Sequence, residues 1–523
     1  MSRFYSRVIS RFVSRGNLMR VLFASAEAYP LAKTGGLADV SAALPRALAE
    51  LGVDVRLVLP GYPCALEAAA NKIVETERPR AAGAEPTRLI RGCMPDTGLP
   101  IWLVDCPDLF NRKGRLYQDH AGADWPDNAQ RFAYFSATAA QLASGKLVPH
   151  WQADVIHAND WHTGLLPILV GPARKQRPAT VFTIHNLAYQ GLFPSDILAS
   201  LPLPDGIFTP EGIEFYGKLS FLKAGIRFGD HITTVSPSYA REILGSEFGC
   251  GLDGLLRHRM KSVTGILNGV DYRRWNPSTD GDLPARFDVG DLSGKRICKA
   301  ELQRELGLEV APTIPLIAWL SRIIDQKMAD VVSHALPAIL ERDVQLVMLG
   351  EGDPTLEIQL ADAVQHYPGR LAVRIGYDEG LAHRFHGGAD LLLHPCRFEP
   401  CGLTPLYAMR YGALPIVRHV GGLADTIVDA TEWSVRAGHA TGFAFREPSA
   451  TAMLDCIDRA LAFYAQPVLF RKIQLRAMSR QFGWNASARR YLALYRRLAP
   501  YAAPAHRDFE SDEIVQARGL HSI

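Results

Sequence analysis

The densest group of chemically capable residues lies in HPCRFEPCGLTPLYAMRYG, residues 394–412. Glu399 follows the apolar run ADLLL, and a stretch of helical composition begins near Leu403. A carboxylate at a strand end can accept hydrogen bonds from sugar hydroxyls. The N–H groups of Gly402–Thr404, next to Cys401, would open the helix and could bind a phosphate. The segment predicts a site for a phosphorylated sugar; a purely structural turn is the alternative.

A second group of residues carries positive charge. Arg322 follows the apolar run PLIAWL, and Lys327 comes five residues later in SRIIDQK. A guanidinium fork and a point charge in one loop suit the oxygens of a diphosphate. A surface ion pair is the alternative. Residues 350–353 (GEGD) form another glycine-rich strand exit, but a lone GxG is weak evidence of a binding site.

The sequence KTGGLAD places Lys33 two residues before Gly35 and Gly36, where a helix should begin. Glycine allows a ligand to approach the backbone, and the helix start is positively polarised. Asp39 lies in the first turn, where it could simply favour the helix dipole. GxxxxGK[ST] is absent, so this is not a P-loop. The letters GGLAD return at 421–425, which suggests two similar strand–helix turns facing one ligand.

Histidines and aspartates raise the question of a metal. His185 ends the run ATVFTIHN and could contact a sugar or a diphosphate oxygen, or be structural. His157, Asp160 and His162 in HANDWH have a loosely metal-like spacing but would need a further ligand. The DxD triplet 280–282 lies in a Pro/Ser-rich loop, so we expect a solvated turn. We therefore predict no metal site.

The elements that position these residues alternate between short apolar runs and longer helical stretches. The expected strands are RVLFAS, DVRLVLP, LPIWLVD, DVIHAN, ATVFTIHN and HITTVS, then PLIAWLSR, VQLVMLGEGD, LAVRIGYDE, ADLLLHPC and ALPIVRHVGG. Such alternation predicts α/β architecture with parallel sheets covered on both faces. Ligands then bind beyond the carboxyl ends of the strands, where the polar residues above occur.

Composition excludes several classes of function. The 523 residues carry a formal net charge of only +3, so no nucleic-acid footprint stands out. Eight cysteines are scattered without CxxC pairs, which favours reduced thiols in a cytoplasmic protein. No apolar run approaches the roughly 18 residues of a membrane span. Ser-Arg repeats before residue 19 could form a basic amphipathic segment; we expect an upstream extension instead.

With these residues assembled, the chain resembles the bacterial glycogen synthases and plant starch synthases, glycosyltransferase family 5. The resemblance runs from Met19 to about Leu498 and rests on KTGGLADV, DWHTGL, TIHNLAYQG, SFLKAGI, ILNGVD, RFEPCGLT and GGLADTI. It implies a GT-B fold, in which two Rossmann-like domains enclose a cleft. The resemblance also implies transfer of glucose from ADP-glucose, with retention, to the 4-hydroxyl of an α-1,4-glucan such as glycogen, without a cofactor. The residues do not decide whether the sugar donor is ADP-glucose or UDP-glucose.

The implied domains are an extension at 1–18, an acceptor domain at 19–265, a nucleotide-sugar domain at 266–480, a helix at 481–500 crossing back to the first domain, and a tail at 501–523.

The resemblance assigns roles residue by residue. The implied donor-binding residues are Lys33, Gly35, Gly36, Asp39, Asp160, His185, Asn268, Arg322, Lys327, Tyr377, Glu399, Cys401, Gly402, Leu403 and Thr404. The implied catalytic group is Glu399, His185, Lys327 and Arg322. Tyr377 would stack on the nucleobase, while Tyr117 and Asp160 would line the acceptor side.

Three positions depart from the family pattern. Met328 stands where glycine is usual, Cys396 where serine is usual, and Tyr407 where related retaining transferases often carry a second glutamate. Other readings stay open: another GT-B transferase, a glucan phosphorylase with pyridoxal phosphate, or a non-catalytic glucan-binding protein. An NAD-dependent dehydrogenase would carry GxGxxG after its first strand, and this sequence has no such motif there.

Overall fold

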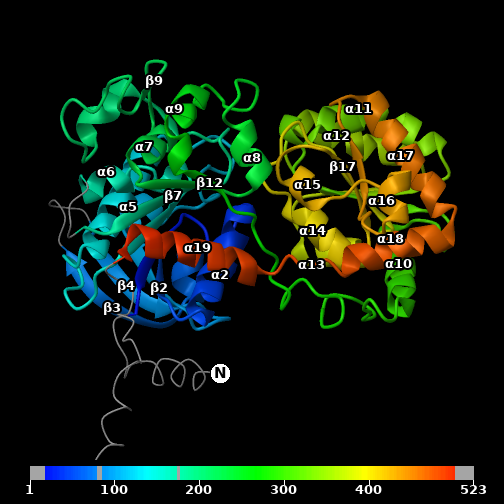
Figure 1. Cartoon of the computed structure of the whole chain (residues 1–523), viewed down its shortest axis with the longest axis horizontal. Helices are drawn as coiled ribbons and strands as arrows, with labels where there is room; N and C mark the ends of the chain where they lie inside the picture. Colours follow the sequence, from blue (N-terminus) through cyan, green and yellow to red (C-terminus); the bar gives the residue numbers. More distant parts are fainter. Residues whose placement is uncertain (1–17, 79–84, 173–176, 501–523) are drawn as a thin grey trace, which may run out of the picture.

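The protein is described by a computed structural model that covers residues 18–78, 85–172 and 177–500. Two lobes lie side by side (Figure 1). The predicted extension, apart from Leu18, and the tail 501–523 lie outside the described residues. No helix within the described ranges is long and apolar enough to cross a membrane.

A nine-stranded sheet forms the centre of the first lobe, in the order β12-β11-β7-β6-β1-β2-β5-β4-β3. Its strands are β1 (Arg20–Ala24), β2 (Asp54–Pro60), β3 (Ala70–Arg78), β4 (Thr87–Cys93), β5 (Pro100–Asp105), β6 (Val155–Asn159), β7 (Ala179–Ile184), β11 (His231–Thr234) and β12 (Val263–Gly265). From β12 to β5 the neighbours are parallel, whereas β4 and β3 are antiparallel additions. All six strands expected in this half are present; β3, β4 and β12 were not predicted.

Helices cover this sheet. They are α2 (Gly36–Glu50), α3 (Pro63–Ala68), α4 (Pro107–Phe110), α5 (Asn128–Ala143), α6 (Leu166–Val170), α7 (Phe221–Phe228), α8 (Pro237–Glu242) and α9 (Asp253–His258). In α2, Leu37, Val40, Leu44 and Leu48 are buried at helical spacing. A small sheet of β8 (Leu192–Pro194), β10 (Lys218–Ser220) and β9 (Glu214–Phe215) was also unpredicted.

The second lobe has a six-stranded, entirely parallel sheet in the order β15-β14-β13-β16-β17-β18. The strands are β13 (Leu316–Leu320), β14 (Gln345–Gly350), β15 (Leu371–Ile375), β16 (Leu391–His394), β17 (Leu414–Arg418) and β18 (Phe443–Phe445). Its helices are α10 (Ser293–Leu306), α11 (Ala329–Glu341), α12 (Pro354–Ala363), α13 (Glu379–Gly388), α14 (Leu403–Arg410), α15 (Gly421–Thr426), α16 (Glu432–Arg436), α17 (Ala450–Tyr464) and α18 (Pro467–Met478). In chain order this is 3-2-1-4-5-6, the arrangement of a Rossmann fold.

The strand order locates the place for a ligand. It reverses between β1 and β6 in the first sheet and between β13 and β16 in the second. A crevice opens at such a reversal because the two following loops leave in opposite directions. Thus the segments after β1 and β6, and after β13 and β16, should bind the substrates.

The last helix, α19 (Trp484–Leu498), returns to the first lobe and packs on α2 (Figure 1). The Tyr495 hydroxyl lies 2.7 Å from Nδ1 of the buried His157. Where the chain crosses back, the N–H of Val270 donates to the carbonyl of Phe482 at 2.7 Å. The two crossing segments therefore run together as a two-stranded connection between the lobes.

Candidate functional site

Glu399 is the centre of the second lobe's half of the site. It follows β16 and is 7% exposed. Its Oε2 atom accepts from His394 Nε2 at 3.0 Å, from Cys396 Sγ at 3.2 Å and from Lys327 Nζ. Burial would raise the pKa of Glu399, but the charge of Lys327 and these hydrogen bonds outweigh it and hold the pKa well below its usual range. Glu399 is therefore a permanently ionised acceptor.

The cations follow β13. Burial acts to lower the pKa of Lys327, yet Cys396 and Glu399 beside it raise the pKa above its usual value, so the ammonium stays charged. Arg322 is exposed and donates from Nη1 to the Tyr189 hydroxyl at 2.8 Å, across the two lobes. Both cations thus lie in the segment that follows β13, at the reversal of the second sheet.

Helix α14 begins at Leu403, beside Glu399. Gly402 precedes it at φ 82°, in the left-handed region that favours glycine, and a Cβ there would lie 2.5 Å from the Leu423 side chain. The first N–H groups of a helix, here at Leu403 and Thr404, have no partner within it. An anion placed there would be stabilised by these groups and by the helix dipole.

Asn268 lies next to this helix start. It is 5% exposed and lies beside Cys401, whose pKa burial raises to about 12. Within the described chain, the buried Oδ1 of Asn268 has no partner. A buried oxygen acceptor without a donor is costly, so this atom suits a ligand hydroxyl.

The first lobe's half of the site is organised by Glu27, which sequence reasoning missed. Its carboxylate accepts from Thr34 N at 2.7 Å, Gly35 N at 3.2 Å and the Tyr117 hydroxyl at 2.7 Å. Glu27 is 3% exposed and is the first acidic residue after β1. That position at a strand exit was the available signal. Glu27 therefore shapes the KTGG turn and holds Tyr117 in place.

Asp160 and His185 end neighbouring strands. Asp160 has φ 57°, an unusual backbone for aspartate, and its Oδ1 accepts from His185 N at 2.8 Å. Burial raises the pKa of Asp160 to about 7 and lowers the pKa of His185 to about 3. His185 Nε2 lies 2.9 Å from Asn159 Oδ1, while Asn159 Nδ2 donates to Ala24 O. Neutral His185 thus carries its proton on Nε2, leaving Nδ1 as an acceptor.

The other two histidines of HANDWH serve packing. His157 contacts Tyr495 and Thr183, and His162 stacks on Trp161 at 3.9 Å. Over the described ranges, the groups of three metal-ligand side chains with atoms within 4.8 Å are His394–Cys396–Glu399 and Asp280–Asp282–His383. His157, Asp160 and His162 form no such group.

The expectation of a solvated turn at the DxD triplet is wrong for Asp280. This residue is 6% exposed, and its Oδ2 accepts from His383 Nδ1 at 2.7 Å and from the Tyr411 hydroxyl. Oδ1 accepts from Asp282 N at 2.9 Å, and the other two residues of the triplet, Gly281 and Asp282, are exposed. Oδ2 therefore joins the connecting segment to His383 of α13 and to Tyr411 at the end of α14, while Oδ1 closes the local turn. Sequence composition could not reveal partners about a hundred residues away.

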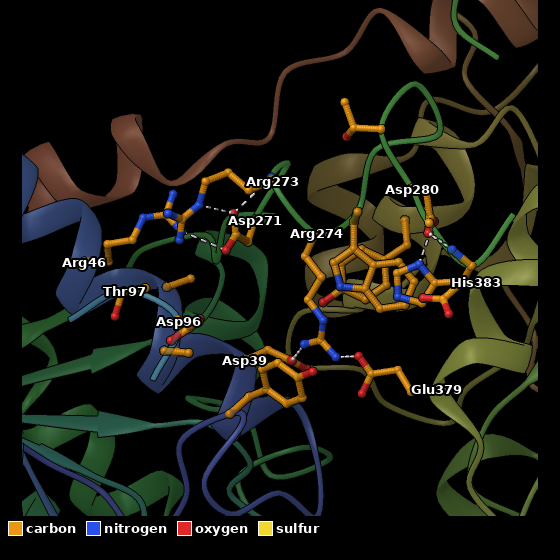
Figure 2. A pocket seen from close by; sticks show the side chains of 18 of the residues that line it. Asp39, Arg46, Asp96, Thr97, Asp271, Arg273, Arg274, Asp280, Glu379 and His383 are labelled. Atoms are coloured by element: carbon orange, nitrogen blue, oxygen red, sulfur yellow. Dashed lines mark hydrogen bonds and ion pairs between the residues drawn. The ribbon is translucent and has the colours of Figure 1, made fainter. Parts of the chain in front are cut away.

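Lys33 belongs to a separate network around Arg274. Figure 2 shows the Arg274 side chain between Asp39 and Glu379. Asp39 accepts from Lys33 at 3.0 Å and from Arg274 at 3.3 Å, and Glu379 pairs with Arg274 and lies 3.7 Å from Lys33. Tyr377 is 63% exposed and donates to Glu379 at 2.6 Å. This network borders an interlobe cavity of about 580 Å³. Asp39 is thus an organiser of this network. Lys33 is paired with the carboxylates of Asp39 and Glu379.

The departures at Met328 and Tyr407 have structural explanations. Met328 adopts φ 51° and ψ 34°, a left-handed conformation suited to glycine, yet its side chain is fully buried. Tyr407 stacks on Trp275 at 4.0 Å with an interplanar angle of 4°, and Trp275 stacks on His383 at 3.9 Å. Tyr407 is therefore part of an aromatic stack at the cavity wall.

The two GGLAD copies begin α2 and α15. A Cβ on Gly36 would lie 3.4 Å from Leu403 Cδ1, so the first copy faces the start of α14. Gly422 N donates to Glu399 O at 3.0 Å, so the second copy holds the Glu399 loop. Asp425 accepts from the Ser238 hydroxyl of the first lobe at 2.7 Å. Each copy thus contributes to the boundary between the lobes.

Comparisons with known proteins agree with this geometry. A starch synthase catalytic domain matches residues 20–258, and a group 1 glycosyl transferase domain matches 314–462. The glycogen synthase of Burkholderia thailandensis is 49% identical over 92% of this chain and 90% of its own length. That of Paramagnetospirillum magneticum is 50% identical, over 92% and 98% respectively.

Solved structures extend the comparison. The catalytic domain of starch synthase IV from Arabidopsis thaliana, bound to ADP and acarbose, is 32% identical with a TM-score of 0.84, covering 93% of this chain and all of that one. Sucrose-phosphate synthase from Thermosynechococcus elongatus shares the fold, at 18% identity and a TM-score of 0.57 over 92% of this chain and all of that one. Together with the strand orders and the site, these similarities show that the chain belongs to the family of starch and glycogen synthases, glycosyltransferases of the GT-B fold.

Proposed function

We propose that this glycosyltransferase elongates glycogen by transferring glucose from ADP-glucose to the non-reducing 4-hydroxyl of an α-1,4-glucan, with retention of configuration. The observation that carries the proposal is the buried Lys327–Glu399 pair at the reversal of the second sheet, together with Asp160 and His185 at the ends of the neighbouring strands β6 and β7 of the first. ADP bound to the Arabidopsis relative supports adenine as the base, and acarbose bound there supports an oligosaccharide acceptor.

Charge decides the mechanism. As the glycosidic bond to the diphosphate breaks, positive charge grows at the anomeric carbon and negative charge on the leaving phosphate. Arg322, Lys327 and the N–H groups that open α14 stabilise that negative charge more in the transition state than in the ground state. Lys33 joins them by exchanging the carboxylates of Asp39 and Glu379 for phosphate.

Sugar recognition uses neutral and anionic acceptors. Ionised Glu399 accepts from glucose hydroxyls, Asn268 Oδ1 accepts another, and His185 Nδ1 accepts near the 6-hydroxyl. Because Glu399 is tied to Lys327, it is a poor nucleophile. The acceptor 4-hydroxyl therefore attacks on the face from which the diphosphate leaves, and a phosphate oxygen takes its proton. Tyr377 stacks on the nucleobase, and Tyr117 lines the acceptor side.

The test is incorporation of labelled glucose into glycogen from ADP-glucose and, in parallel, from UDP-glucose, each with and without chelator. Glu399→Ala is the inactive variant, and Glu432→Ala, whose side chain is 90% exposed, is the matched control. The proposal expects transfer from ADP-glucose that survives chelation and Glu432→Ala but is lost in Glu399→Ala. Transfer from neither donor, or equal activity of the two variants, would refute it; product hydrolysis by an α-1,4-specific glucanase tests retention.

A further inference from the structure

Every contact to the carboxylate of Glu399 falls on one of its oxygens. Lys327, His394 and Cys396 all donate to Oε2. Within the described part of the chain, no donor reaches Oε1. The two oxygens of one carboxylate thus have different tasks: Oε2 is anchored, and Oε1 is available to a ligand.

We propose that His394 and Cys396 are positioning residues that hold Oε2 of Glu399 so that Oε1 faces the transferred sugar. This inference rests on the proposed function, since it deepens the role of Glu399 in it. Lys327 alone cannot do this work. Its ammonium is a point charge on a flexible stem, and the diphosphate of the donor will draw on the same charge.

His394 is well placed for such a task. It is the last residue of β16, is 3% exposed, and therefore has little freedom of backbone or ring. Burial and the charge of Lys327 lower the pKa of His394, so the ring is neutral. Facing an ionised carboxylate, Nε2 must carry the single proton, and the buried Nδ1 has no partner over the described ranges. The tautomer is therefore set by Glu399.

Cys396 supplies a second neutral donor. It is fully buried, and burial raises the pKa of its thiol well above the usual value, so the sulfur keeps its proton and donates it. A thiol is a weak donor with a single S–H, and serine, the usual residue here, has a single O–H that donates more strongly. Two neutral donors orient the carboxylate without adding charge that would compete with Lys327 for the diphosphate.

The experiment uses paired variants of the full chain. Cys396→Ala removes one hydrogen-bond donor to Glu399, and Cys396→Ser keeps a donor at that position. His394→Leu removes the other hydrogen-bond donor at similar volume, and His394→Gln replaces it with an amide donor. The matched control is Cys298→Ala, because Cys298 is equally buried in the same lobe and its thiol also donates, to Ala285 O at 3.1 Å. For each protein, kcat and KM for ADP-glucose are measured, together with the affinities for ADP-glucose and for ADP.

Cys396→Ala and His394→Leu should each lower kcat/KM roughly tenfold, through kcat and through weaker binding of ADP-glucose, because a hydrogen bond to a charged group is lost. ADP has no glucose, so its affinity should stay unchanged while the advantage of ADP-glucose over ADP shrinks. Cys396→Ser and His394→Gln should recover most of the activity. The Cys298→Ala control should behave as wild type in these measurements.

Several results would overturn the inference. One is an equal loss in the Cys298→Ala control; another is a fall in ADP affinity that matches the fall for ADP-glucose, as a merely structural role predicts. If the wild-type protein transfers no glucose, the proposed function fails, and the inference is judged on binding alone. The inference is then refuted if Cys396→Ala and His394→Leu still bind ADP-glucose more tightly than ADP by the wild-type ratio. It is also refuted if the wild type shows no preference for ADP-glucose over ADP.

Discussion

Met328 provides a quantitative test of how this chain tolerates an unfavourable backbone. Its φ of 51° and ψ of 34° lie in the left-handed region, which costs an L-residue roughly 1–2 kcal/mol. Against this, its side chain is fully buried in the core of the second lobe. Truncating such a side chain costs about 2–5 kcal/mol. Burial is the larger effect over most of these ranges, so Met328→Gly should destabilise the protein by roughly 0–4 kcal/mol, although glycine fits the backbone.

The order of two truncations isolates the backbone contribution. Met328→Ala loses the same side chain but keeps the strain, so it should be less stable than Met328→Gly by about 1 kcal/mol. Met453 provides the matched control, because it is equally buried in the same core but lies within helix α17. There the order should reverse, with glycine less stable than alanine by about 1 kcal/mol.

The assay is urea unfolding followed by tryptophan fluorescence, comparing the transition midpoints of the four variants with wild type. The reasoning is refuted if Met328→Ala is as stable as Met328→Gly, or if both positions show the same order. A Met328→Gly protein more stable than wild type would show that burial of this side chain contributes less than the strain costs.

Three further predictions concern the first lobe. Glu27→Gln removes the charge that accepts from the KTGG turn and should raise the KM for ADP-glucose about tenfold; an unchanged KM would contradict its organising role. The pKa of Asp160, raised from 3.8 to about 7, means that its contribution to stability is present below pH 3.8 and is lost as the pH rises towards 7. Asp160→Asn should therefore flatten the fall in melting temperature over this range, and an unaltered slope would count against the shift. Tyr495→Phe leaves the buried His157 Nδ1 without its partner and should lower the free energy of unfolding by about 1–2 kcal/mol; a neutral effect would mean that this hydrogen bond does not stabilise the docking of α19.

Much of the architecture could be predicted from local sequence. Runs such as RVLFAS and PLIAWL are short, apolar and followed by polar residues, and each forms a parallel strand buried in a sheet. The pattern also indicated where ligands bind, because chemistry at a strand's carboxyl end is encoded by the residues that directly follow it. Strands β3 and β4 escaped prediction because their pattern is mixed, with exposed Ile73 and Val74 on the outermost strand.

What the sequence by itself determined, then, is the set of strands, the repeated strand–helix turns and the identity of residues such as Lys327 and Glu399. Only the tertiary structure decided which groups share an atom: that His394 and Cys396 meet Lys327 on one oxygen of Glu399, that Glu27 supports the KTGG turn, and that Asp280 is buried. The physical reason is that apolar periodicity is a local property of the chain, whereas burial, pKa and hydrogen-bond partners depend on residues brought together from distant positions.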